Sequence, residues 1–313
     1  MRMTDRAWAL LVTLALLWGG SFVAVKTALS EMGPFASVFW RTGLGAGALW
    51  IAVAVMRPAL PRDPRFWGAC AVMGLLNNVI PFTLMAWGQK SIESGLTSIL
   101  NASTAVFGAL VAAALLPDER LTARRAAGVG LGVAGVAAIT GPEALGGLDP
   151  RSLGQIAVLA GAFSYACASV WARVRLTGAA PVVSAAGMTT MAFAMMTPLT
   201  LWVEGPPPVI LSAPVWGAVL YYGVLGTGAA FLVYYALMRE AGAANTMLVT
   251  LAIPPAAILA GWAILDERLS ANAYLGLCLI FAGLAVMDGR MLARAGRLRR
   301  RWMSAKGGAA GDV

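Results

Sequence analysis

The sequence predicts an all-helical integral membrane protein in which ten transmembrane helices form two inverted five-helix repeats. Three observations lead to this fold class. Hydrophobic residues make up 59% of the 313 residues and charged residues only 12%, with a mean hydropathy of +0.77, whereas a soluble domain carries about 25% charged residues. The apolar residues lie in long stretches without the period-two alternation of membrane β-strands. The second half of the chain repeats the first.

The apolar stretches have the length that a membrane helix needs. Crossing a hydrocarbon core of about 30 Å takes about 20 apolar residues, and ten stretches meet this criterion, near residues 7–29, 35–56, 66–88, 95–117, 122–141, 152–174, 181–203, 214–237, 243–265 and 270–288. The first stretch is too long for the apolar region of a cleaved signal peptide, and its counterpart around Tyr165 lies in mid-chain. We therefore expect it to be a true span.

The repeat is clearest in one hexapeptide. Residues 118–123 read DERLTA, and residues 266–271, which lie 148 positions later, read DERLSA. Further matched pairs are Gly128 with Gly276, Gly135 with Gly283 and, at an offset of 147, Trp18 with Tyr165 and Lys26 with Arg173. We therefore divide the chain into a first repeat (1–144), a second repeat (145–288) and a basic cytoplasmic tail (289–313) whose apolar residues recur at the spacing of a helix lying on an anionic membrane surface.

The basic residues predict the orientation, because an excess of Lys and Arg marks cytoplasmic loops. With the N-terminus inside, 18 of the 23 basic residues are cytoplasmic, and only Lys26, Arg41, Lys90, Arg151 and Arg268 lie elsewhere. Both termini are then cytoplasmic in a bacterial-type inner membrane. Because each repeat has an odd number of spans, the second repeat must cross the membrane in the opposite direction. Accordingly, Arg124-Arg125 of the first repeat align with the uncharged Asn272-Ala273 of the second.

Several short motifs occur in a characteristic order. Residues 17–22 read LWGGSF and are followed by Lys26, Arg41 lies in the second span, and each Glu-Arg-Leu segment is followed by a glycine, Gly128 or Gly276. In these motifs and in its doubled five-span plan the chain resembles the EamA-type members of the drug/metabolite transporter superfamily, over about residues 7–288. The resemblance implies export of small metabolites, often amino acids and related compounds. We expect neutral and aromatic amino acids to be the favoured substrates. Inverted repeats are a recurring plan of secondary transporters, which alternate access around a midplane site.

Helix-breaking residues near the middle of several spans predict where such a site lies. Interrupted helices free backbone groups that can face a cavity. The candidate hinge residues are Gly19, Gly20, Gly226, Gly228, Pro254 and Pro255. We expect the cavity between spans one, three, four, six, eight and nine.

Candidate substrate contacts are polar, aromatic or basic residues of these spans and their neighbours. They are Trp18, Ser21, Asn78, Asn101, Tyr165, Tyr222, Lys26 and Arg41. A mid-span asparagine needs a polar partner, aromatic rings pack apolar substrate groups, and the two cations would guide a carboxylate. Each type has a structural alternative: an interhelical hydrogen bond for the asparagines, core packing for the rings, and snorkelling to the outer interface for Lys26 and Arg41.

Residue types that are missing bear on the mechanism. The sequence has no histidine, no acidic residue at a span centre and no Walker A motif. We therefore expect facilitated transport or exchange without a cofactor or metal ion, and no enzymatic activity. The expected partners are a small-molecule substrate and the lipid bilayer, with no nucleic acid; the sequence does not distinguish monomer from homodimer. The alternatives are a phosphorylated-sugar or nucleotide-sugar exchanger, which would need a cluster of basic residues in the cavity, and a membrane-embedded enzyme or scaffold.

Overall fold

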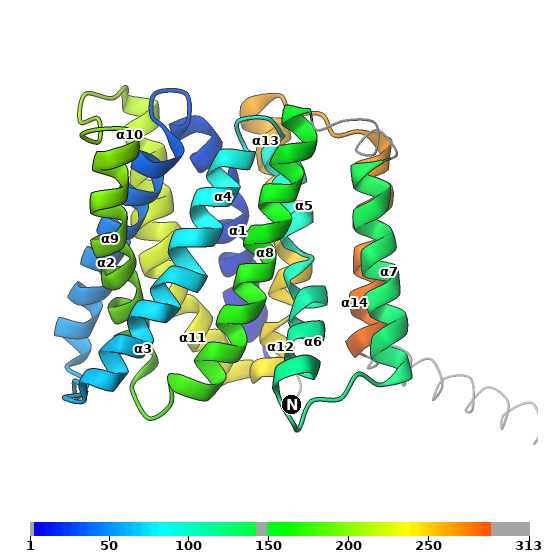
Figure 1. Ribbon diagram of the computed structural model, residues 1–313, viewed down its shortest axis with the longest axis horizontal. Coiled ribbons are helices and arrows are strands. Elements are labelled where there is room, and N and C mark those ends of the chain that lie inside the picture. The colour runs from blue at the N-terminus through cyan, green and yellow to red at the C-terminus, as the bar shows by residue number, and fades with distance from the viewer. Residues whose placement is uncertain (1–2, 142–148, 289–313) are drawn as a thin grey trace, which may run out of the picture.

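The computed structural model describes residues 3–141 and 149–288, and the predicted basic tail lies outside this range. The described chain is helical and forms ten rods that stand side by side (Figure 1). In chain order they are α1 (Asp5–Ala28), α2 (Pro34–Met56), α3–η1–α4 (Pro64–Gly74, Leu75–Val79, Ile80–Gly88), α5–α6 (Ser94–Asn101, Thr104–Leu115), α7 (Ala123–Thr140), α8 (Pro150–Arg175), α9 (Pro181–Val203), α10–η3–α11 (Ala213–Leu220, Tyr221–Ala229, Ala230–Ala241), α12–α13 (Ala243–Thr246, Val249–Leu265) and α14 (Ala271–Asp288).

The predicted all-helical membrane fold is confirmed. Eight rods of the described chain are long and apolar enough to cross a membrane, and Val249–Leu265 is a shorter apolar helix. The tenth rod, α7, has 18 residues and carries Arg124 and Arg125 in its first turn, which shortens its apolar part. Because α7 packs along α14, which is itself long and apolar enough to span, we count it as the fifth rod of the first half.

Local sequence explains where many rods begin. Proline occupies the first position of α2, α3, α8 and α9, where its missing N–H has no helical partner to lose. The side chains of Thr4, Asp63, Thr122 and Asp149 accept hydrogen bonds from the free N–H groups at the starts of α1, α3, α7 and α8. Local proline and capping residues thus mark where these helices begin.

The two halves are related as an inverted pair. The contact of α1 with α13 has its counterpart in the contact of α8 with α5–α6, while α2–α9 and α7–α14 are each a helix packed against its own repeat copy. At the last interface a Cβ on Gly128 would lie 2.6 Å from the carbonyl oxygen of Gly283, and a Cβ on Gly135 would lie 2.8 Å from that of Gly276. Since Gly128 aligns with Gly276 and Gly135 with Gly283, the contact is reciprocal, as a two-fold relation requires.

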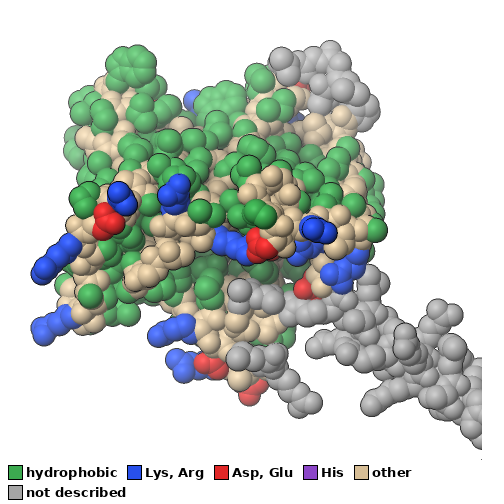
Figure 2. Space-filling view, turned by 60° about the horizontal axis from the view of Figure 1, so that its bottom comes forward, with side chains coloured by type: hydrophobic (Ala, Val, Ile, Leu, Met, Phe, Trp, Pro, Cys, Tyr) green, Lys and Arg blue, Asp and Glu red, His purple; other side chains and the backbone are tan. Residues whose placement is uncertain are grey.

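The surface separates an apolar belt from a charged end. Figure 2 shows Lys and Arg side chains gathered toward the face that carries the N-terminus, below a broad apolar surface. Exposed basic residues of this N-terminal face include Arg57, Arg62, Arg65, Arg120 and Arg124. We call the other end of the rods the opposite face.

Interruptions occur at matching places in the two halves. The third and eighth rods each contain a π-helical segment, η1 at Leu75–Val79 and η3 at Tyr221–Ala229, so that their positions differ by about the repeat offset. The predicted break at Gly226 and Gly228 therefore coincides with η3. By contrast, α1 continues unbroken through Gly19 and Gly20.

The glycines of α1 serve close packing. A Cβ on Gly19 would lie 2.7 Å from the Cβ of Ala256 in α13, so only glycine permits this approach of the two backbones. Pro254 and Pro255 lie inside the continuous helix α13, and the ninth rod is interrupted earlier, between Thr246 and Val249. Membrane helices tolerate internal proline because neighbouring groups satisfy the freed carbonyls.

Candidate functional site

A cavity of about 630 Å3 lies between the two halves of the molecule. Its wall is formed by residues of α1, α2, α3, η1, α4, α5, α6, α8, α9, η3, α11 and α13. Apolar and aromatic side chains dominate the wall, with scattered hydroxyl and amide groups. This composition is typical of small-molecule sites, in which a few polar groups orient a largely apolar ligand.

Five of the predicted substrate contacts and one predicted hinge residue line this cavity. They are Trp18, Ser21, Arg41, Asn101, Tyr165 and Gly226. The structure therefore brings together residues that are separated by more than 200 positions in the chain. Asn78, Tyr222 and Lys26 are not part of the wall, and neither are Gly19, Gly20, Gly228, Pro254 and Pro255.

The neighbouring asparagines of η1 face different surroundings. Asn77 lines the cavity, whereas Asn78 is fully buried and donates a hydrogen bond of 3.5 Å to Thr189 of α9. Asn77 Nδ2 donates to Asn78 Oδ1 at 3.0 Å. Successive residues of a helix point in different directions, and of this pair it is Asn77 that faces the cavity.

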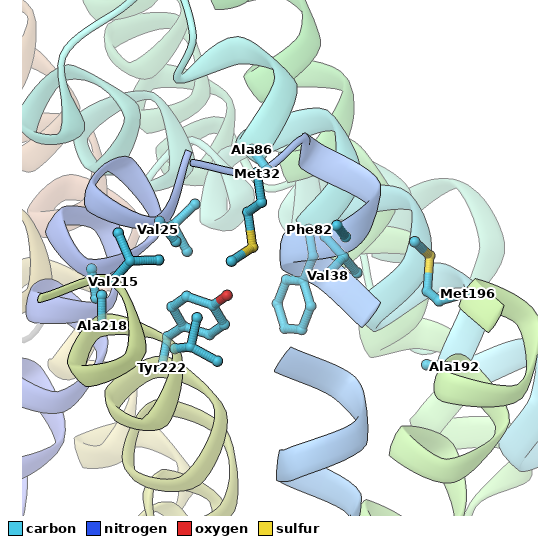
Figure 3. Close-up of a cluster of buried hydrophobic side chains, with 14 of the residues drawn as sticks. Val25, Met32, Val38, Phe82, Ala86, Ala192, Met196, Val215, Ala218 and Tyr222 are labelled. Atoms are coloured by element: carbon cyan, nitrogen blue, oxygen red, sulfur yellow. The ribbon is translucent and has the colours of Figure 1, made fainter. Parts of the chain in front are cut away.

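Tyr222 lies in an apolar cluster beside the cavity. Figure 3 shows its ring among buried side chains that include Val25, Met32 and Val215. Its hydroxyl is 3.3 Å from the donor Ser37 Oγ. The residue is fully buried, so its contacts are those of core packing.

Lys26 connects α1 to the turn that follows α4. Its Nζ donates to the carbonyl oxygens of Gln89 and of Ile92, the latter at 2.8 Å. The side chain is therefore held by helix-terminal carbonyls, which favour a cation. Lys26 thus ties α1 to the α4–α5 turn. In this arrangement its side chain neither snorkels to the outer interface nor lines the cavity.

Arg41 is the one charged side chain among the described residues that line the cavity. Its guanidinium carbon lies 3.7 Å from the centre of the Phe82 ring, and its Nε donates to Thr227 Oγ1 of η3 at 3.2 Å. No ion pair of Arg41 occurs in the described part of the chain. A cation at the centre of a span costs about 2.5–3.5 kcal/mol on insertion scales, and Arg41 lies between the centre and the start of α2. A cation–π contact of about 0.5–2 kcal/mol offsets part of such a cost.

Aromatic side chains line the cavity beside Arg41 and elsewhere along its wall. Tyr165 packs against Phe82 with ring centroids 6.4 Å apart, and Trp18 packs against Tyr234 at 5.7 Å. All four residues line the cavity. Trp18 and Tyr165, which occupy matching places in the two repeats, thus lie in one wall around a common space.

The sequence-based prediction missed three side chains of the cavity wall. Phe82 holds the Arg41 guanidinium, Thr227 binds it, and Gln89 presents a buried Oε1 without a hydrogen-bond partner in the described structure, although its Nε2 donates to Phe22 O at 3.2 Å. Thr227 stands between the two mid-span glycines that the sequence singled out, which was a usable signal. Phe82 and Gln89 carry no local signal, because a phenylalanine or a glutamine near a span end is common.

The cavity extends toward the N-terminal face. Its wall includes Leu176 and Ala179 between α8 and α9, Met238 near the end of α11 and Thr250 at the start of α13. On the other side, the wall ends near Gln89, where Lys26 crosses from α1 to the α4–α5 turn. Access is therefore directed to the N-terminal face.

Carboxylates tie the two halves together at the opposite face. Glu267 accepts hydrogen bonds from Ser94 N (2.9 Å), Ser94 Oγ (2.6 Å) and Gly95 N (3.3 Å) at the start of α5, and Glu204 accepts from Phe35 N (3.1 Å) and Ala36 N (2.9 Å) at the start of α2. Glu31 accepts from Ser212, and these hydrogen bonds lower the pKa of its carboxyl group. Each contact satisfies free helical N–H groups and places an anion at a positive helix end.

At the N-terminal face the equivalent carboxylate makes different contacts. Glu119, the repeat counterpart of Glu267, pairs with Arg125 at 2.6 Å and with Arg173 at 3.3 Å. The hydrogen bond from Arg125 lowers the pKa of the Glu119 carboxyl group. The two copies of one motif therefore form a helix cap at one face and an ion-pair cluster at the other.

Comparison with known proteins gives a consistent result. The model of the EamA-like transporter family matches the chain twice, at residues 6–141 and 152–287. An uncharacterised transporter of Bacillus subtilis is 24% identical over 88% of this chain and 94% of the relative. A probable terminal-alkyne amino-acid exporter of Streptantibioticus cattleyicolor is 27% identical over 94% and 97%, and a probable amino-acid metabolite efflux pump of Escherichia coli is 25% identical over 91% and 95%.

A solved crystal structure supports the fold independently of these names. It superimposes with a TM-score of 0.65 at 21% identity and covers 94% of this chain and 100% of its own. The two family matches coincide with the two five-rod halves, and the cavity lies between them. The chain is a membrane transporter and belongs to the EamA-like transporter family.

Proposed function

We propose that this transporter exports small carboxylate metabolites with an apolar or aromatic body, a class that includes the neutral and aromatic amino acids. The observation that carries the proposal is Arg41, a cation without an acidic partner in the described chain, held in an aromatic wall. A guanidinium binds a carboxylate through paired hydrogen bonds, and rings such as those of Trp18 and Tyr165 pack an apolar side chain. The names of two relatives, an amino-acid exporter and an amino-acid metabolite efflux pump, agree with this class.

We further propose that the N-terminal face is cytoplasmic, so that both termini lie inside and the described conformation takes up substrate from the cell. The basic residues gathered at this face support the orientation. The two repeats then rock about the cavity and release substrate at the opposite face. No acidic side chain lines the described cavity wall, which supports facilitated transport or exchange over proton coupling. A single cation also gives little support to a phosphorylated-sugar exchanger.

Counterflow in proteoliposomes tests this function. Vesicles loaded with an unlabelled amino acid are expected to accumulate the labelled compound, with the same rate in the presence and absence of a proton gradient. Trp18→Ala is expected to lower the rate several-fold, while Trp202→Ala, which changes an exposed ring at the end of α9, leaves it unchanged. Counterflow of a sugar phosphate but of no amino acid would contradict the proposal.

A further inference from the structure

The charges of the cavity wall are unbalanced. Arg41 is the one ionised group among the described lining residues, and no carboxylate faces it. All described acidic residues lie in loops or in the terminal turns of helices, at positions 5, 31, 63, 93, 118, 119, 149, 204, 240, 266, 267 and 288. An empty cavity thus presents an uncompensated positive charge.

The donors of Arg41 are only partly used. A guanidinium has five N–H donors, and the described protein engages Nε alone, through Thr227 Oγ1. The Phe82 ring covers one face of the guanidinium plane and fixes its direction. The terminal N–H groups remain available to two oxygens of one ligand, which is the geometry that a carboxylate fills.

A ligand ammonium group finds no comparable partner. The α-ammonium of an amino acid lies next to its carboxylate, and therefore close to the Arg41 cation, which repels it. The described wall offers it only neutral acceptors, such as hydroxyl groups and Asn101 Oδ1. The wall near Arg41 therefore favours an uncharged donor, such as a hydroxyl or amide N–H, over an ammonium group.

We infer that the site prefers monocarboxylate anions whose α-position is uncharged, such as hydroxy acids, unsubstituted acids or N-acylated amino acids, over the zwitterionic amino acids of the same shape. The inference rests on the proposed function, because it concerns the same cavity and the same anchoring of a carboxylate. It specifies which charge state of that substrate class the cavity selects.

Four ligands with one aromatic ring separate the contributions of carboxylate and ammonium. They are phenylalanine, 3-phenyllactate, 3-phenylpropionate and 2-phenylethylamine. Binding to the purified full-length protein is measured by ligand-induced thermal stabilisation, so that passive diffusion of hydrophobic acids through lipid plays no part. We expect both acids without an ammonium group to bind about tenfold more tightly than phenylalanine, as removal of one charge repulsion predicts. The amine should not bind.

Three variants connect this selectivity to the wall. Arg41→Gln is expected to abolish binding of both acids, whereas Arg65→Gln, at the exposed start of α3, leaves it unchanged. Asn101→Asp adds an anion to the wall and keeps the oxygen that accepts from Thr104 at 3.4 Å. It should tighten phenylalanine binding and weaken binding of 3-phenyllactate. This reversal would not arise from a general loss of stability.

The outcomes distinguish the two levels of the proposal. If phenylalanine binds at least as tightly as both ammonium-free acids, in a manner that requires Arg41, the proposed function stands and the preference for anions is overturned. If none of the three carboxylates binds the wild-type protein, the proposed function and the inference fall together. Unchanged selectivity in Asn101→Asp would also count against the charge argument.

Discussion

At the scale of single residues, adjacent positions of η1 carry separate roles. Asn77 faces the cavity and Asn78 faces Thr189 of the neighbouring rod. A π-helical segment places an extra residue in a turn, and such segments often mark functional sites. The two asparagines are joined by one hydrogen bond, so that the residue in the protein interior orients the residue in the cavity wall.

This division of roles predicts opposite effects of two matched substitutions. Asn77→Ala should weaken substrate binding several-fold with little change in melting temperature. Asn78→Ala should lower the melting temperature, since it removes an interhelical hydrogen bond worth about 0.6 kcal/mol on average, and should have the smaller effect on affinity. Thermal unfolding and ligand binding, measured on the same detergent-solubilised samples, check both. A larger affinity loss in Asn78→Ala would reverse the assignment.

At the scale of elements, packing of α7 against α14 depends on glycine at the contact. The reciprocal contacts of Gly128, Gly135, Gly276 and Gly283 leave no room for a side chain. In lipid, where apolar side chains gain nothing from leaving the solvent, small residues that let backbones approach are what hold helices together. The duplicated glycines are therefore an interface between repeat copies.

Filling this interface is expected to destabilise the protein. In Gly135→Leu the side chain would meet the carbonyl oxygen of Gly276 and the side chain of Ile280, with an expected loss of about 1–3 kcal/mol from overpacking. Gly130→Leu is the matched control on the same helix, because a Cβ there meets nothing within 4 Å. Equal melting temperatures of the two variants would contradict this prediction, because they would mean that α7 and α14 can move apart without loss of stability.

The Glu267 cap is a second feature at this scale. It joins the α13–α14 turn to the start of α5 on the opposite face, and we expect it to break when that face opens. Glu267→Gln removes the charge that favours the helix N-terminus, an effect of about 0.3–1 kcal/mol, and should shift the protein toward opening at that face.

Spin labels at two exposed positions of these turns, Lys90 and Ser270, can measure the shift. The distance distribution between them should gain a longer component in Glu267→Gln. The control is Glu119→Gln, the repeat counterpart of Glu267, whose partners Arg125 and Arg173 lie at the N-terminal face. Identical distributions in all three proteins would exclude a role of the cap in closure.

At the scale of the whole molecule, the inverted repeat and the charge distribution together predict topology. Exposed Arg residues gather at the N-terminal face, toward which the cavity also extends. We expect Thr122→Cys to be protected from a membrane-impermeant maleimide in right-side-out vesicles and Val209→Cys to react, in a protein whose three cysteines are replaced. The reverse pattern would place the cavity opening outside the cell.

The sequence by itself determined the helical membrane class, the rods and their beginnings, and the duplication. These depend on local hydropathy, capping residues and a linear repeat. It also pointed to Trp18, Arg41, Asn101 and Tyr165, because polar or aromatic residues within spans are conspicuous.

Only the tertiary structure decided which side of each rod faces the cavity. Asn77 and Asn78 are adjacent but point in different directions, and in a helix that is apolar all round no periodicity reveals which side faces the cavity. For the same reason Tyr222 was expected in the cavity and lies in the core, while Phe82, Gln89 and Thr227 were missed. Lys26 and Glu267 acquire their partners from rods distant in sequence, so their roles as ties between rods follow from packing alone.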